Sequence, residues 1–188
     1  MLLVLSLGGC GSRSAPPRPE GPIEPARPTA SPLPPRPATL RLDSVDPCAL
    51  LTPAQVARLS LLDGIPSARP DGRDCVWGRN PPHPDNAWRA QVILTHGADY
   101  YRGSVTGAQL REISGYTAVA TNSTLALNRD HQCLLYVDVA PGQSLEVSYH
   151  NLDGDYPGIN HEVACQLAGQ VAGLMLANLK ARAAKGAR

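Results

Sequence analysis

Four cysteines in the C-terminal part of the chain constrain its fold more than any other feature. They are Cys48, Cys75, Cys133 and Cys165. An even number of cysteines in an exported chain implies disulfides, and four cysteines allow three pairings. We expect Cys48–Cys75, which would tie a helix start to a strand, and Cys133–Cys165, which would fix a C-terminal helix to a hairpin. Each bond would close a loop of roughly 30 residues and contribute about 3–4 kcal/mol in the chain-entropy model.

A structural zinc site is the competing interpretation of these four thiols. Such sites usually take cysteines in pairs that lie only a few residues apart, and the sequence contains no such pair. Disulfides are therefore favoured, and they leave no free thiol for catalysis. On this interpretation we expect no metal and no cofactor.

An apolar run opens the chain and ends at a cysteine. Residues 1–7 are nearly all apolar, and two glycines stand directly before Cys10. Small residues are typical of the cleavage sites of signal peptides, and the stretch LGGC (7–10) resembles a lipobox, in which the cysteine is acylated and becomes the new N-terminus. A chance cysteine is the alternative. The apolar run is not preceded by the basic residues that open a signal peptide, so we expect the natural chain to begin upstream of Met1. The run is also shorter than the roughly 20 apolar residues of a membrane-spanning helix.

Proline dominates the stretch that follows Cys10. Residues 16–37 hold more than half of the 19 prolines, and proline fixes φ and removes backbone donors, so neither helix nor sheet is expected there. We expect a spacer, with a docking peptide as the alternative because Pro-x-x-Pro patterns occur in it. The predicted organisation is a signal peptide (1–9), a lipid-anchored tether (10–42) and a folded domain (43–188).

Local patterns predict an α+β domain. Thr52 and Gln55 form a capping box around Pro53, which predicts a helix over about 53–61, and helical spacing of apolar residues predicts another over about 161–183. Alternation predicts strands over 75–77, 88–96, 123–128 (the weakest), 133–139 and 145–150. The expected architecture is a short N-terminal helix, an antiparallel sheet of about four to six strands, and a long C-terminal helix packed on one face. Arg89 and Gln91 are assigned to the polar face of a half-buried strand.

Three stretches of this sequence, DPCALLTPAQVARL, CVW and ACQLAGQVAGLM, together resemble an actinobacterial lipoprotein family known as domain of unknown function 3558. The resemblance covers about residues 46–179. It implies an envelope lipoprotein with an α+β domain and paired cysteines, and it implies no activity. A looser similarity connects such domains with the extracellular sensor domains of some actinobacterial kinases.

Motifs for catalysis are incomplete in this sequence. His161-Glu162 begins like the helix motif of zinc proteases, but Cys165 stands where the second histidine should be. Asp153 and Asp155 could hold a cation together with this pair, but the spacing is not that of a calcium loop, and a polar turn is the favoured interpretation. We therefore assign no catalytic residue and no metal ligand.

Three tyrosines and the net charge indicate which kinds of ligand this domain could bind. Tyr100, Tyr101 and Tyr116 are candidate ligand contacts, and the net charge of +1 gives no reason to expect nucleic acid. The leading hypothesis is a non-enzymatic domain, anchored by lipid to the outer face of the cell membrane, that binds an envelope protein or a small ligand. The alternatives are an envelope hydrolase, with a site formed from His150, Asp153 or Asp155, and His161, and a structural spacer of the cell wall.

Overall fold

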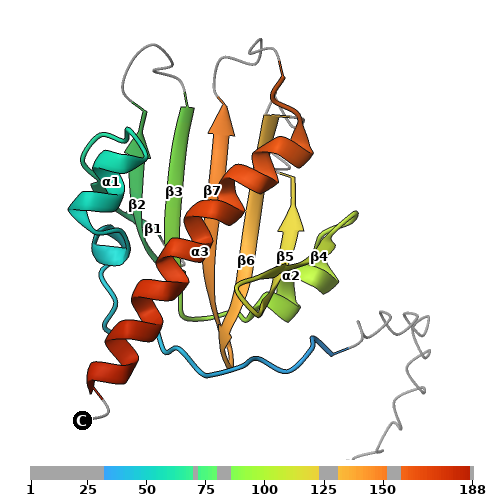
Figure 1. Ribbon diagram of the computed structural model, residues 1–188. Helices are drawn as coiled ribbons and strands as arrows, with labels where there is room; N and C mark the ends of the chain where they lie inside the picture. Colours follow the sequence, from blue (N-terminus) through green and yellow to red (C-terminus); the bar gives the residue numbers. More distant parts are fainter. Residues whose placement is uncertain (1–31, 70–71, 80–85, 123–130, 152–157, 187–188) are drawn as a thin grey trace, which may run out of the picture.

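The computed structural model describes residues 32–69, 72–79, 86–122, 131–151 and 158–186. Within them, an antiparallel sheet carries a long helix across one face (Figure 1). The helical elements are η1 (Pro47–Leu50, a 3-10 helix), α1 (Pro53–Arg58), α2 (Ala98–Ser104) and α3 (His161–Gly186). The strands are β1 (Ile65–Arg69), β2 (Gly72–Gly78), β3 (Asn86–Ile93), β4 (Gln109–Ile113), β5 (Tyr116–Thr121), β6 (Gln132–Ala140) and β7 (Gln143–Asn151). The predicted α+β architecture with a long C-terminal helix is confirmed.

Among the described residues, the sheet has seven strands in the order β1-β2-β3-β7-β6-β5-β4, so the expected range of four to six was too low. The additional strands are β1 at one edge and the β4–β5 hairpin at the other side of the sheet. β1 is exposed along its whole length and contains Pro66, so it lacks the alternation by which a half-buried strand is recognised. β4 and β5 form a hairpin in a region without a clear periodicity, and the predicted strand over 123–128 lies outside the described residues.

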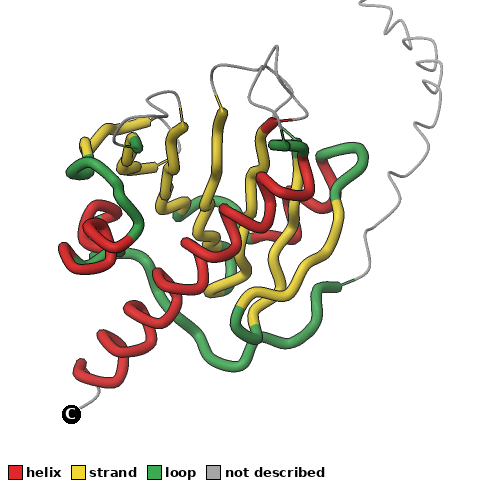
Figure 2. The backbone as a smooth tube through the Cα atoms, turned by 45° about the horizontal axis from the view of Figure 1, so that its top comes forward, coloured by secondary structure: helices red, strands yellow, loops and turns green. Residues whose placement is uncertain are grey.

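The core lies between the sheet and α3, on what we call the helix face. Every second residue of β3, β6 and β7 points there, including Trp88, Leu135 and Tyr149, and the rings of Trp88 and Tyr149 meet edge to face at 4.9 Å. Figure 2 shows α3 lying along this face from a second direction. The buried stripe of α3 consists of Ala164, Cys165, Ala168, Val171, Ala172, Met175, Leu176 and Leu179. Its small residues let the helix lie close to the sheet. None of the described helices is long and apolar enough to cross a membrane.

The described part of the chain does not begin with an α-helix, because its first element is the 3-10 helix η1. The helix α1 follows and starts at Pro53, where Thr52 and Gln55 form the capping box. It ends at Arg58, earlier than expected, and Ser60 just beyond it has φ 55°. The left-handed conformation of Ser60 turns the chain out of the helical path.

Both predicted disulfides are present. Cys48–Cys75 joins η1 to β2, and Cys133–Cys165 joins β6 to α3. Cys75, Cys133 and Cys165 are buried in the core between the sheet and the helical elements, and Cys48 is partly buried and packs against it. The two bonds therefore attach η1 and α3 to the same face of the sheet.

The folded part of the chain extends further toward the N-terminus than the predicted boundary at residue 43. Leu40 and Leu42 lie in the core. The Leu40 N–H donates to the Val139 carbonyl (2.7 Å), and the Leu42 N–H donates to Gln143 Oε1 (2.9 Å). The assignment of residues up to 42 to the tether was therefore wrong. The sequence did not predict this, because only four residues separate Pro37 from Leu42, too few to show the spacing of a helix or a strand.

Burial of Leu42 generates a stability prediction. The substitution Leu42→Ala should lower the free energy of unfolding by about 2–5 kcal/mol, because it leaves a cavity in the core. The control Leu62→Ala removes the same atoms from a side chain that is 48% exposed and should change the free energy by less than about 0.5 kcal/mol. Chemical denaturation measures both. Equal effects would show that residues before 43 do not contribute to the fold.

Candidate functional site

A groove of about 700 Å³ runs between β4 and α3. One wall consists of the consecutive residues 110–114, and the other of Cys165, Gln166, Gly169 and Gln170 from one side of α3. Successive side chains of a strand point to opposite faces. A wall of consecutive residues therefore means that the groove follows the edge of β4 rather than a face of the sheet.

The outer edge of β4 has no strand partner in the described sheet. The two-residue turn Ser114-Gly115 has positive φ at both positions (54° and 84°), which is the hairpin turn of type I′. The pair that flanks such a turn, Ile113 and Tyr116, forms the hydrogen-bonded pair, and bonded and non-bonded pairs then alternate. It follows that Leu110 and Glu112 direct their backbone N–H and C=O groups to the open edge.

An ion pair connects the two walls at one end of the groove. Arg111 Nη1 donates to Glu162 Oε1 (2.9 Å), and Arg111 Nη2 donates to Glu162 Oε2. The guanidinium lowers the pKa of Glu162, and the carboxylate raises the pKa of Arg111, in both cases chiefly through the hydrogen bonds. Arg111 Nε is buried and has no partner among the described residues. A buried donor is not open to a ligand in this conformation, so the groove presents the ion pair at this end and not Nε.

Glycine allows α3 to approach β4. A Cβ atom at Gly169 would lie 3.2 Å from Ile113 Cδ1, closer than an ordinary contact. The neighbouring Gln166 and Gln170 are exposed and line the same groove. A larger residue at 169 would push the helix away and change the width of the groove.

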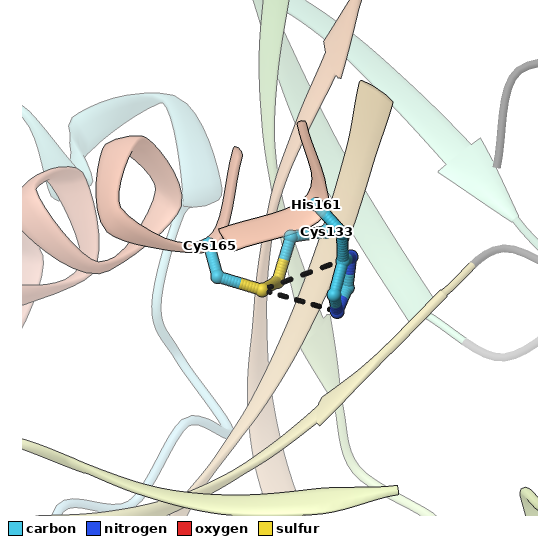
Figure 3. Close-up of side chains that lie close together, drawn as sticks. All are labelled: Cys133, His161 and Cys165. Carbon is cyan, nitrogen blue, oxygen red and sulfur yellow. Dashed lines mark hydrogen bonds between the residues drawn. A yellow bond between two sulfur atoms is a disulfide. The ribbon is translucent and has the colours of Figure 1, made fainter. Parts of the chain in front are cut away.

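The Cys133–Cys165 disulfide lies beside the groove, because Cys165 is one of its lining residues. His161 precedes Cys165 by one helical turn, and its Nε2 atom is 3.5 Å from Cys165 Sγ (Figure 3). His161 Nδ1 lies 2.7 Å from the carbonyl oxygen of Gln132. Glu162 pairs with Arg111 instead of pointing to this group. The incomplete zinc-protease motif is thus a histidine–disulfide cluster.

The side of the sheet opposite α3, which we call the polar face, is buried. The sequence assigned Arg89 and Gln91 to the polar face of a half-buried strand, but Gln91 is only 2% exposed. Arg89 donates to Glu146 (2.6 Å), and both side chains are largely buried. The other buried polar residues of this face are Asp74, Thr121, Gln132, Asp138, Ser144 and Ser148. Arg89 Nε and Asp74 Oδ1 have no partner among the described residues.

On the polar face, Ser148, His150 and Gln132 form a chain that resembles the arrangement of a hydrolase. His150 Nε2 lies 2.9 Å from Ser148 Oγ, and His150 Nδ1 lies 3.0 Å from Gln132 Oε1. Ser148 is fully buried, however, so no substrate reaches its hydroxyl in this conformation. Burial, assisted by the charges of Arg89 and Arg69, lowers the pKa of His150 to about 4.

The histidines of the hydrolase hypothesis lie on opposite sides of the sheet. The Gln132 side chain contacts His150 on the polar face, and the Gln132 carbonyl contacts His161 beside the core. The structure does not bring the two rings into one cleft. Asp153, Asp155 and the predicted lipidation site Cys10 lie outside the described residues.

The three candidate tyrosines do not form one site either. Tyr101 on α2 stacks on Tyr136 of the polar face with ring centroids 3.5 Å apart, and Tyr100 beside it is 51% exposed. Tyr116 is buried on the helix face, where Lys180 Nζ lies 4.9 Å from the centre of its ring. The groove itself was missed in the sequence, although the Ser114-Gly115 turn could have revealed the hairpin that forms it.

His150 predicts a specific dependence of stability on pH. The unfolded chain binds a proton at His150 below its usual pKa of 6.5, whereas the folded chain binds one only near pH 4. Stability should therefore fall as the pH falls through this window, by about 3 kcal/mol from this residue. His150→Gln should lose less stability over the same window, as measured by urea denaturation. The control His96→Gln should follow the wild-type curve, and identical curves for all three chains would contradict the prediction.

Comparison with known proteins identifies a protein family that matches this chain. The family described as "Protein of unknown function (DUF3558)" matches residues 5–178. No curated protein and no solved structure matches the chain. The match includes both walls of the groove and confirms the resemblance that the sequence motifs indicated. Since it covers most of the sequence, the chain belongs to the DUF3558 family.

Proposed function

We propose that this chain is a lipid-anchored envelope protein whose folded domain binds an extended segment of another polypeptide between β4 and α3. The anchor is Cys10, and the proline-rich stretch holds the domain away from the outer face of the membrane. The observation that carries the binding function is the groove along the open edge of β4.

The chemistry of this groove suits a polypeptide better than a compact ligand. An extended segment that adds to a sheet edge satisfies the outward backbone groups of the strand, and side-chain pockets beside the edge supply specificity. In this groove, Leu110 and Glu112 supply the backbone groups. The exposed amides of Gln166 and Gln170 can donate or accept.

The occupant is a segment of another protein and not the proline-rich stretch of this chain. A strand that pairs with β4 must donate backbone N–H groups at alternate positions. Proline has no N–H, and residues 16–37 carry prolines at close intervals. A partner with an exposed segment of ordinary residues meets the requirement.

A backbone substitution tests the binding mode. The chain with Cys10→Ser would be used to select peptides from a displayed library, and the affinity of a selected peptide would be measured by titration. Glu112→Pro removes an N–H at the open edge, where proline is tolerated, and should weaken binding about tenfold, the effect of one lost hydrogen bond. Glu112→Ala keeps the N–H and should change the affinity less than about twofold. Equal affinities for both variants, or no selected peptide, would contradict this mode.

Mass spectrometry tests the anchor. The full-length protein extracted from its own cells should start at residue 10 and carry acyl chains on Cys10. Cys10→Ser should lose the acyl mass and leave the membrane fraction. An unmodified chain that starts at Met1 would exclude lipid anchoring and leave the groove hypothesis intact.

A further inference from the structure

We infer that Cys133, Cys165 and His161 form a zinc site when the disulfide between the two cysteines is reduced. The three potential ligand atoms lie within 4.8 Å of one another. His161 and Cys165 come from one turn of α3, and Cys133 faces them from β6 (Figure 3). This set differs from the four-thiolate site considered for the sequence, because it uses one disulfide and a histidine that no other function explains.

The distance between His161 Nε2 and Cys165 Sγ is close to the distance between two ligand atoms of one zinc ion. Zinc binds thiolate at about 2.3 Å and imidazole at about 2.0–2.1 Å, so tetrahedral geometry places the two ligand atoms about 3.6 Å apart. His161 Nε2 lies 3.5 Å from Cys165 Sγ. Nδ1 of the same ring lies only 4.0 Å from this sulfur, so the sulfur stands beside the ring and not on the axis of the Nε2 lone pair. On reduction, the two sulfur atoms must therefore move apart, and Cys165 Sγ must rotate toward that axis. The backbones of β6 and α3 can stay in place.

The hydrogen bond at the other ring nitrogen sets the required tautomer. His161 Nδ1 lies 2.7 Å from the carbonyl oxygen of Gln132, and a carbonyl can only accept. Nδ1 therefore carries the proton in the neutral ring, which leaves the lone pair of Nε2 available to a metal. Metal-binding histidines almost always donate their second N–H to such a partner, which fixes the ring and raises its basicity.

The location of the cluster leaves room for a fourth ligand. Cys165 lines the groove beside β4, so water can reach the metal from that side. Glu162 is held by Arg111 and does not compete for this position. Three protein ligands and one water complete a tetrahedral zinc centre.

The redox step balances with a dithiol reductant. The dithiol transfers two electrons and two protons to the disulfide, becomes a disulfide itself and leaves Cys133 and Cys165 as thiols. Zn²⁺ then replaces the two thiol protons, and His161 adds its lone pair without a proton change. The disulfide has no ionisable proton, so the oxidised chain does not bind the metal. Zinc binding and the disulfide are therefore alternative states of one site.

Cobalt provides a spectroscopic test. The chain with Cys10→Ser would be reduced with a phosphine, freed of reductant without oxygen and titrated with Co²⁺, whose thiolate charge-transfer band reports sulfur ligation. We expect the band to saturate at one ion per chain, and zinc to displace the cobalt. Zinc should slow the alkylation of Cys133 and Cys165, read by mass spectrometry, relative to the reduced chain without metal, and should leave the rate at the part-exposed Cys48 unchanged. The oxidised chain should give no band.

A pair of histidine variants separates this site from adventitious binding. His161→Gln should weaken cobalt binding at least about tenfold, because it removes one ligand. His96→Gln, which changes a histidine on the other side of the sheet, should bind as the wild type does. Equal affinity of His161→Gln and wild type, protection of Cys48 instead, or the absence of a thiolate band in the reduced chain would each overturn the proposal.

Discussion

The packing of α3 against β6 and β7 positions most of the other features of this domain. The buried stripe of the helix lies on the two central strands, and the Cys133–Cys165 bond fixes the first turns of the helix to β6. From this position α3 also forms one wall of the groove beside β4, so the disulfide that stabilises the core also limits the width of the groove. The close approach of Gly169 to Ile113 limits it at a second point.

The polar face shows how a buried polar surface can be tolerated. A buried charge is costly unless it is paired and hydrogen-bonded, and Arg89 with Glu146 and Arg36 with Asp138 meet this condition. His150 remains neutral for the same reason, since burial disfavours its charged form. The contribution of this face to stability therefore depends on pH.

Two adjacent residues at the N-terminus of α3, His161 and Glu162, make different contacts. Glu162 bridges to Arg111 across the groove, and His161 faces the disulfide. A peptide in the groove and a metal at the reduced cysteines would therefore be neighbours, separated by Cys165. Occupation of the groove and the redox state of Cys165 would then influence each other through direct contact.

Local patterns in the sequence were enough to predict several elements of this fold. Helical spacing predicted α3, alternation predicted β3, β6 and β7, and cysteine positions favoured the observed disulfides over two other pairings. Which segments cover each face of the sheet and which edge stays open depends on contacts between residues far apart in the sequence, and no local pattern predicts them. Alternation shows that Gln91 and Trp88 point to opposite sides of a strand, but burial depends on segments distant in sequence. The open edge of β4 likewise follows from the pairing of β3 with β7, a long-range contact for which no local pattern exists.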